Sequence, residues 1–344
     1  MPTTCSTNRK RNAGSGKETT LFEDVLSFIE AHERFLISGH VKPDGDCLGT
    51  EVALYHFLRQ MGKKVRILNA DPLERSLDFL GDDTPFEVHQ RGQSLPEHDV
   101  HCLVDCSTLG RTGSVGQAAE GLSGVEYMVV DHHVGSDLGD GDILLWNPEA
   151  PSCGCLVYDL YRTAGAPLTP EAAEGIFVSI VADTGWFQYS NTTDEALAIA
   201  ANLVSVGVKP HLIYNRLYRR NPREQIQLLG EALGHVRFEE DGRLAICPLP
   251  RSFMAKAESG GFNTDEILDQ CRSVEGVEIV ALLKEILDGK VKISLRSSDR
   301  YDVDDIAREF GGGGHKKASG AELPGPLSEA VQALEERCRE RLRD

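Results

Sequence analysis

Short apolar runs alternate with helix-like periodic segments along the first part of the chain. The runs FLISGH, VRILNA, HCLVD, YMVVD and DILLW have the length and the branched aliphatic content of buried strands. Helical periodicity follows the first run at 47–62 and returns at 155–164, 170–183 and 194–206. This alternation predicts an α/β fold built on a doubly wound parallel sheet.

The pattern changes near residue 208. Residues 210–233 show helical periodicity interrupted by a proline. Apolar strand-like runs follow at 243–249, 277–286 and 290–298, with a helix near 264–273 and a helical segment at 302–310. We therefore expect four parts: a disordered leader over 1–19, the doubly wound domain over 20–207, a helical linker over 208–235 and a smaller α+β domain over 236–342.

The charge balance restricts the ways in which this chain can bind phosphate. The 344 residues include 54 acids and 36 bases, for a net charge of −18. Such a chain repels nucleic acid at long range, so a phosphate ligand requires metal ions or a local basic patch. The acidity could instead reflect a salt-rich cell interior. With no signal-like or membrane-length apolar segment, we expect a cytoplasmic protein without a membrane partner. Its nine cysteines then stay reduced, and we interpret Cys153 and Cys155 as packing or helix-start residues.

Carboxylates and histidines gather where predicted strands and helices end. These residues are His40, Asp44, Asp46, Asp105, Asp131, His132, His133 and Asp183. Carboxyl ends of parallel strands lie at one edge of a sheet, so we expect most of these side chains to converge. Taken singly, each aspartate could be a helix cap or turn former. Taken together, they favour two divalent cations sharing a bridging aspartate, a pair suited to displacement at phosphorus. The carboxylate excess favours manganese or magnesium.

We expect a glycine-rich loop near the C-terminus, which is a second candidate anion site. GGGGHKKASG (311–320) offers backbone N–H groups and two lysines, but it lacks the spacing of a Walker loop. Arg296, in the nearby strand-like SLRSS, could contact a phosphate with two hydrogen bonds. The alternatives are a flexible turn and an exposed strand arginine.

These motifs together resemble those of the DHH phosphoesterase superfamily. HVKPDGD, VDCS, VVDHH and ADTGWF are similar to its four motifs, and GGGGHKKASG is similar to the signature of the DHH-associated C-terminal domain, over about residues 20–340. The layout most resembles the subgroup of bifunctional oligoribonucleases and 3′-phosphoadenosine-5′-phosphate (PAP) phosphatases, the nano-RNases. The resemblance implies hydrolysis of short RNA to mononucleotides and of PAP to AMP, with two cations, Mn²⁺ first and Mg²⁺ or Co²⁺ as alternatives.

The resemblance also implies a role for each residue. The first cation would bind His40, Asp44 and Asp105, and the second would bind Asp46, Asp105, His132 and Asp183. His133 would contact the scissile phosphate, and Asp131 would orient the loop or a histidine. Arg296, Gly312, Gly313, Gly314 and His315 would hold the far end of a short substrate. Cys47 stands where the family usually has a small residue, which could make activity sensitive to oxidation.

Other functions stay open at this point. The same chemistry could serve a linear dinucleotide of the pApA type, pyrophosphate, polyphosphate or single-stranded DNA. A non-catalytic nucleotide-binding module is the alternative from a different class, and a role in alanyl-tRNA editing is a third. The complete set of acidic and histidine residues argues against both. A homodimer is one candidate assembly.

Overall fold

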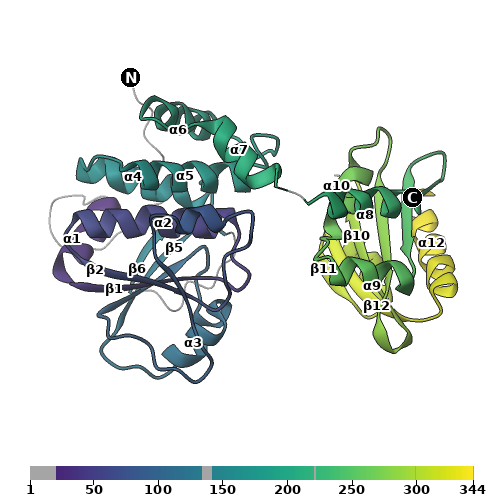
Figure 1. Ribbon diagram of the computed structural model, residues 1–344, viewed down its shortest axis with the longest axis horizontal. Helices are drawn as coiled ribbons and strands as arrows, with labels where there is room; N and C mark the ends of the chain where they lie inside the picture. Colours follow the sequence, from purple (N-terminus) through teal and green to yellow (C-terminus); the bar gives the residue numbers. More distant parts are fainter. Residues whose placement is uncertain (1–20, 134–141, 221, 299, 344) are drawn as a thin grey trace. The chain divides into compact units, whose positions relative to one another are not determined.

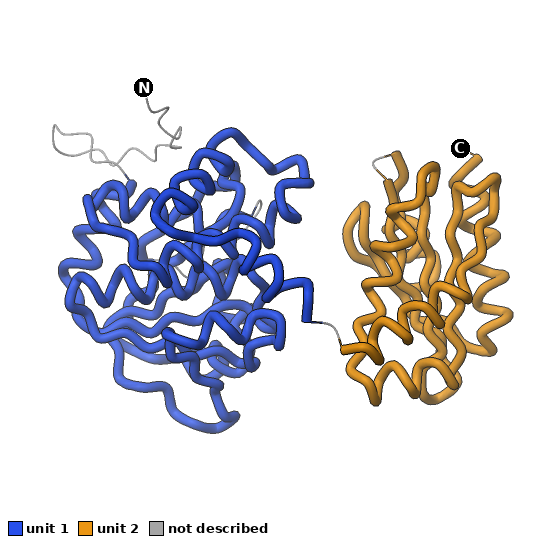
Figure 2. The backbone as a smooth tube through the Cα atoms, turned by 45° about the horizontal axis from the view of Figure 1, so that its top comes forward, with its two compact units in different colours: residues 1–220 blue, residues 221–344 orange. Residues whose placement is uncertain are grey.

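The computed structural model describes residues 21–133, 142–220, 222–298 and 300–343 (Figure 1). The chain divides into two compact units, Met1–Arg220 and Asn221–Asp344 (Figure 2). The predicted leader lies outside the described residues. The division falls inside the segment predicted as a linker, because its two helices belong to different units. Helix α7 (Pro210–Tyr218) buries Ile213 in the core of the first unit, and α8 (Arg223–Leu233) buries Ala232 in the second.

The first unit is built on a six-stranded sheet, and the predicted doubly wound parallel sheet is confirmed. All its described strand pairs are parallel, in the order β3-β2-β1-β4-β5-β6. The strands are β1 Arg34–Gly39, β2 Lys64–Asn69, β3 Phe86–Val88, β4 Val100–Val104, β5 Glu126–Asp131 and β6 Ile143–Trp146. The chain winds outward from β1 to β3 and then returns to β4 beside β1. Ligands bind at such a reversal point, outside the carboxyl ends of the strands.

Helices cover both faces of this sheet. On one face lie α2, α4 and α5, with α6 behind them, and α3 lies on the other (Figure 1). Their bounds are α1 Leu21–Ala31, α2 Gly45–Gln60, α3 Ser114–Ala119, α4 Cys153–Ala164, α5 Pro170–Asp183 and α6 Asp194–Ser205, with short 3₁₀ turns at Asp78–Gly81 and Leu109–Thr112. Phe57 and Tyr161 meet edge to face, 4.9 Å between ring centroids, in the main core. The core therefore lies between the sheet and the α2, α4 and α5 layer.

Helices α2 and α5 cross in close contact at two glycines. A Cβ on Gly49 would lie 2.3 Å from the carbonyl oxygen of Gly175, and a Cβ on Gly175 would lie 2.6 Å from that of Gly49. Both distances are shorter than real Cβ contacts allow. The contact brings the start of α2 beside the last turns of α5, which is where the candidate site forms.

No single helix among the described residues is long and apolar enough to cross a membrane. Helices α6 and α7 reach the length and apolar composition of a membrane span only when they are taken together, and the chain bends by 106° at the break between them. Both helices contribute buried residues, among them Ile199 and Ile213, to the core of the first unit.

The second unit has a mixed sheet in the order β11-β12-β10-β9-β8-β7, in which only β8 and β9 pair in parallel among the described strands. Its elements are β7 Arg237–Glu239, β8 Leu244–Leu249, α9 Arg251–Ser259, α10 Asp265–Arg272, β9 Ile279–Glu285, a 3₁₀ turn Leu287–Gly289, β10 Lys290–Ser297, α11 Val303–Glu309, β11 Gly313–His315, β12 Ala318–Pro324 and α12 Leu327–Arg343. Helices α11 and α12 share a core with one face of the sheet, and α8, α9 and α10 share a core with the other face along β8 and β9.

The glycine-rich segment is a hairpin and not the loop that the sequence predicted. Gly313, Gly314 and His315 pair with Gly320, Ser319 and Ala318. The glycines allow the two strands to approach closely, since a Cβ on Gly312 would lie 2.1 Å from the carbonyl oxygen of Gly320. Runs of glycine disfavour a strand by local propensity, and pairing in the sheet overrides that preference here.

The glycine contact between α2 and α5 gives a stability prediction. Gly49→Ala should lower the free energy of unfolding of the first unit by about 1–3 kcal/mol, because the added methyl group overpacks the contact. Gly110→Ala, with nothing within 4 Å of its Cβ position, is the matched control. Denaturant unfolding followed by tryptophan fluorescence measures this unit alone, because Trp146 and Trp186 are the two tryptophans of the chain. Equal stability of the two variants would contradict the prediction.

Candidate metal centre

The turn between β1 and α2 places the first three candidate ligands. His40 directly follows β1, and Asp44 is the N-cap of α2, where its Oδ1 accepts hydrogen bonds from the backbone N–H groups of Asp46 and Cys47 at 3.0 and 3.2 Å. This cap begins the helix so that Asp46 points inward from its first turn and is fully buried. Asp44 stays 60% exposed, with Oδ1 4.0 Å from Nε2 of His40.

Asp105 lies at the centre of the site. It follows β4 with a φ of 55°, a left-handed conformation that costs energy for a residue with a side chain and that recurs at functional sites. Its Oδ2 lies 3.2 Å from Nε2 of His40, and its Oδ1 lies 3.8 Å from Nε2 of His132. The two oxygens of one carboxylate therefore face two different histidines.

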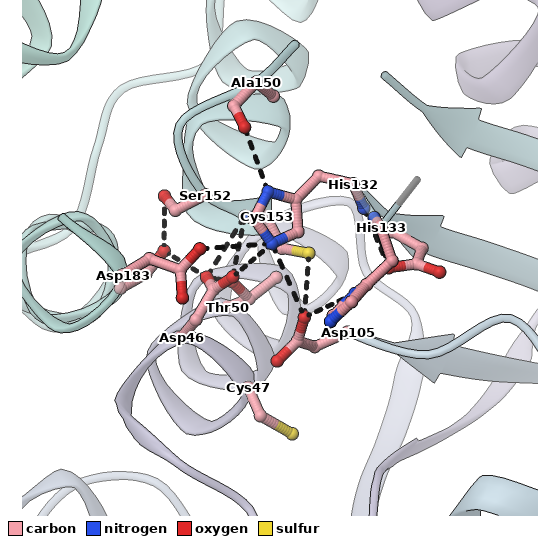
Figure 3. Close-up of polar contacts among 12 residues, drawn as sticks. Asp46, Cys47, Thr50, Asp105, His132, His133, Ala150, Ser152, Cys153 and Asp183 are labelled. Carbon is pink, nitrogen blue, oxygen red and sulfur yellow. Dashed lines mark hydrogen bonds and ion pairs between the residues drawn. The ribbon is translucent and has the colours of Figure 1, made fainter. Parts of the chain in front are cut away.

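Asp46 is held by groups from three helices (Figure 3). Its Oδ1 accepts hydrogen bonds from the hydroxyls of Thr50 at 3.2 Å and Ser179 at 2.6 Å, and the backbone N–H of Cys153 points at both carboxylate oxygens at 3.1 Å. Burial, with the nearby charges of Asp105 and Asp183, still raises the pKa of Asp46 well above its ordinary value. The hydrogen bonds fix the position of the Asp46 carboxylate. Its repulsion from Asp105 and Asp183 favours a cation beside them.

Two histidines present the same ring nitrogen to these carboxylates. Nδ1 of His40 lies 2.9 Å from the carbonyl oxygen of Val41, and Nδ1 of His132 lies 2.9 Å from that of Ala150. A carbonyl oxygen only accepts, so each Nδ1 must donate its proton. Each Nε2 is then the nitrogen that can bind a cation in the neutral ring. Without a cation, the hydrogen bond to Asp105 raises the pKa of His40 to about 9.

Asp183, the last residue of α5, contacts the site through His132. Its Oδ2 lies 3.2 Å from Nε2 of His132. Burial raises the pKa of Asp183 to about 6, with the Asp105 and Asp44 charges adding to the shift and His132 opposing it. The site thus contains carboxylates that are costly to ionise beside one another without a compensating positive charge.

Asp131 and His133 form a third group at the end of β5. Oδ1 of Asp131 accepts hydrogen bonds from the backbone N–H of His132 at 2.8 Å, from the backbone N–H of His133 at 3.1 Å and from Nδ1 of His133 at 2.8 Å. Asp131 is buried, and the ring of His133 is half exposed. The hydrogen bond to Asp131 raises the pKa of His133. The buried carboxylate therefore fixes both the turn and the orientation of the exposed imidazole.

The structure brings all eight predicted residues to the same edge of the sheet. Among the described residues, ligand atoms within 4.8 Å of one another form three sets: Asp46, Asp105, His132 and Cys153; His40, Cys47 and Asp105; and Asp105, Asp131 and His133. Sequence reasoning missed Cys153 as a neighbour of these ligands, and it also missed Thr50 and Ser179. Thr50 follows Asp46 by four residues on α2, a helical spacing that could have indicated the contact, whereas Cys153 and Ser179 come from α4 and α5 and their spacing carries no signal.

A buried carboxylate behind the site was also missed. Glu51 is fully buried, its Oε2 accepts a hydrogen bond from the side-chain amide of Asn69 at 2.8 Å, and the amide oxygen of Asn69 accepts the backbone N–H of Gly39 at 2.9 Å. This chain of contacts holds the residue that precedes His40. Burial raises the pKa of Glu51 to about 8, and the hydrogen bond from Asn69 opposes the shift.

The second unit has a polar face on β10, β11 and β12. Arg296 and His315 are both register partners of Ala318, so the two side chains project from the same face of the sheet, two strands apart. On β12, which lies between β10 and β11, Gly320 adds no side chain to this face, and it lies in a hollow of about 620 Å³ that Arg296, Lys292 and Glu322 also line.

Further cations lie beside Arg296. Burial lowers the pKa of Lys284 on β9, and the charges of Lys292 and Arg296 lower it further, while Asp265 raises it. Lys284 and Lys292 are register partners on neighbouring strands. These basic residues form a local patch of the kind that a chain with a net charge of −18 needs for a phosphate ligand. The structure thus places the predicted Arg296, Gly312, Gly313, Gly314 and His315 on or beside β10 and the β11–β12 hairpin.

A doubly wound sheet with clustered carboxylates and histidines at its reversal point is the architecture on which the comparisons with known proteins bear, and the family that they show consists of hydrolases of phosphoester bonds. The chain belongs to the DHH family: the model of the DHH family N-terminal domain matches residues 34–180, and that of the DHHA1 domain matches 260–343.

Relatives and solved structures agree with this membership. The chain is 33% identical to the Thermus thermophilus bifunctional oligoribonuclease and PAP phosphatase NrnA, over 94% of either chain. It is 26% identical to the Bacillus subtilis protein of that name, over 87% of this chain and 92% of the relative. An exopolyphosphatase-related protein from Bacteroides fragilis superposes with a TM-score of 0.81 at 27% identity, over 92% of this chain and 96% of that one.

The buried contact between Glu51 and Asn69 predicts how the stability of the metal-free protein depends on pH. Because the pKa of Glu51 is raised on folding, the native state keeps a proton that the unfolded chain loses above pH 4.5, so stability falls as the pH rises toward 8. Glu51→Gln cannot lose this proton, and its free energy of unfolding should fall less between pH 5 and 8. The raised pKa values of Asp183 and His40 also lower the free energy of unfolding, near pH 4–6 and pH 6.5–9, and they do so in both the wild type and Glu51→Gln.

Tryptophan-detected urea unfolding in a chelator buffer measures this difference. Glu30→Gln, on the exposed side of α1, is the control. Parallel pH profiles for the wild type and Glu51→Gln would show that Glu51 is ionised in the native state and would contradict the prediction.

Proposed function

We propose that this chain is a phosphoesterase dependent on two divalent cations, and that it hydrolyses short oligoribonucleotides to mononucleotides and PAP to AMP. The observation that carries the proposal is the position of Asp105, whose two oxygens face two separate groups of ligands. The identity of 33% with an oligoribonuclease and PAP phosphatase over nearly the full chain supports the substrate class.

The residues present fit a pair of cations. Nε2 of His40 and Nε2 of His132 point at carboxylates while each Nδ1 is hydrogen bonded to a carbonyl, which is the orientation of metal-binding histidines. His40, Asp44 and Asp105 would hold one cation, and Asp46, Asp105, His132 and Asp183 would hold the other. We propose Mn²⁺ as the preferred ion, because hard carboxylate oxygens outnumber the imidazoles.

Bound cations would supply charge neutralisation at the phosphoryl oxygens and a water that is acidic enough to attack at neutral pH. Side chains of the protein would position the substrate and donate the proton. Asp131 holds the ring of His133 toward the half-exposed side of the site, where the imidazole can contact the scissile phosphate and donate a proton to the leaving oxygen. Ser179 and Thr50 keep Asp46 from turning away from the ligand cluster.

The second unit would bind the rest of the substrate. Arg296 can contact a phosphate with two hydrogen bonds, and the glycines of β11 and β12 let a nucleotide approach the backbone. The basic side chains on this face are few, which suits a short substrate with one or two phosphates better than a long polymer. We therefore favour oligonucleotides over single-stranded DNA tracts.

Removal of metal is the first test. Dialysis against a chelator should abolish hydrolysis of a 5′-labelled diribonucleotide and of PAP, and Mn²⁺ should restore both activities better than Ca²⁺, which accepts larger and looser coordination. Chromatographic product analysis measures the rates. Full activity after chelation, with metal content below one ion per ten chains by elemental analysis, would contradict a cation-dependent mechanism.

The second test asks whether Asp105 acts in turnover and Arg296 in substrate binding. Asp105→Asn should lower kcat for the diribonucleotide by about 10³-fold or more, because it removes the charge shared by both cation positions. Arg296→Ala should mainly raise KM, by about tenfold, because it removes a contact that is present before and during the reaction. Asp194→Asn and Arg272→Ala, on exposed helix surfaces of the two units, are the matched controls. Similar losses of kcat in Asp105→Asn and Arg296→Ala would refute the assignment.

A further inference from the structure

A cysteine thiol lies among the candidate ligands at the first turn of α4. Sγ of Cys153 lies 3.5 Å from Oδ1 of Asp105, and Figure 3 shows the sulfur directed at that carboxylate. The residue is fully buried, and its sulfur lies within 4.8 Å of ligand atoms of Asp46, Asp105 and His132, which also lie within 4.8 Å of one another. The position therefore offers a soft sulfur ligand beside harder nitrogen and oxygen ligands.

We propose that Cys153 is an additional, thiolate ligand of the second cation, the one that Asp46, Asp105, His132 and Asp183 would hold. It gives this position an affinity for thiophilic divalent cations such as Zn²⁺ and Co²⁺. The inference rests on the proposed function, because it concerns one of the two proposed cation positions. On binding, the thiol loses its proton to solvent and the sulfur lone pair forms the bond to the cation.

The spacing of the four ligand groups suits a small cation. At near-tetrahedral angles, bonds of about 2.0 Å to nitrogen or oxygen and about 2.3 Å to sulfur put a nitrogen–oxygen pair of ligands about 3.3 Å apart and a pair that includes the sulfur about 3.5 Å apart. Nε2 of His132 lies 3.4 Å from Oδ2 of Asp46 and 3.8 Å from Oδ1 of Asp105, and the Cys153 sulfur lies 3.5 Å from that same Oδ1. These separations need only small adjustments to surround one ion.

The backbone of Cys153 fixes the sulfur in place. Its N–H points at both oxygens of Asp46 at 3.1 Å, and the next residue along α4, Gly154, donates its N–H to Ser179 at 2.9 Å. A Cβ on Gly154 would lie 2.3 Å from the hydroxyl oxygen of Ser179, so the helix start fits tightly against α5. The thiol is therefore preorganised toward the ligand cluster.

Two other cysteines serve as comparisons. Cys155, on the same helix, has its sulfur 3.5 Å from the hydroxyl of Ser152. Cys47 has its sulfur 3.9 Å from the carbonyl oxygen of Val104 and packs against Gly39, where an added Cβ would lie 2.0 Å from the sulfur. Cys47 is also near His40 and Asp105, so it is the rival source of a sulfur ligand.

Cobalt spectroscopy on the full chain tests the proposal without an activity measurement. The protein is stripped of metal, titrated with Co²⁺ and analysed for bound cobalt, and the near-ultraviolet spectrum is recorded for a thiolate-to-cobalt charge-transfer band. We expect the band in the wild type, in Cys155→Ser and in Cys47→Ser, and its loss in Cys153→Ser. In competition titrations, Cys153→Ser should weaken Zn²⁺ binding by at least about tenfold and Mn²⁺ binding by less than about threefold.

Three outcomes would overturn the inference: wild-type protein with bound cobalt and no such band, a band that disappears in Cys47→Ser but not in Cys153→Ser, or an equal loss of Zn²⁺ and Mn²⁺ affinity in Cys153→Ser. If Cys153→Ser does not fold, the wild-type spectrum and the Cys47→Ser spectrum still decide. An enzyme active with Mn²⁺ but lacking the cobalt band would refute only this inference. A protein that binds none of these cations would refute the proposed function as well.

Discussion

The structure of the first unit is organised around carboxylates that repel one another at a single point of the sheet. Asp46 and Asp105 are buried, Asp183 lies beside them, and the pKa values of Asp46 and Asp183 are raised because ionising neighbouring buried acids is costly. Such a cluster persists only if some of the acids stay protonated or positive charge balances them. A protonated His40 can supply part of that charge without metal, and divalent cations would supply it fully.

The surrounding fold holds these groups at the distance where the repulsion matters. The Asp44 cap begins α2, the glycine contact between α2 and α5 brings Ser179 to Asp46, and the left-handed turn at Asp105 directs that carboxylate between two histidines. The polar groups in turn hold the elements together, since Asp46 accepts hydrogen bonds from α2, α4 and α5. Packing and site geometry therefore depend on the same few residues.

Most of the larger elements could be predicted from periodicity. The strand expected at 35–40 is β1, Arg34–Gly39, and the helix expected at 170–183 is α5 with those bounds. Short elements such as β3 and α9 were missed, because three to nine residues offer little periodicity. The glycine-rich hairpin was predicted as a loop, because pairing with β12 and not local propensity makes it a strand. The expected linker was divided, because each of its helices buries its apolar side in a different unit.

The sequence by itself determined which residues could form the site. Carboxylates and histidines that follow buried apolar strands must meet at the carboxyl edge of a parallel sheet, because strand direction leaves them no other place. Only the tertiary structure decided which side chains accompany them. Ser179 reaches Asp46 where α5 crosses α2, and Cys153 and Glu51 reach Asp105 and Asn69 where helices pack on the ends of strands, contacts that no local pattern encodes. Sequence spacing predicts neighbours along one element, whereas contact between two helices depends on how closely their backbones can approach.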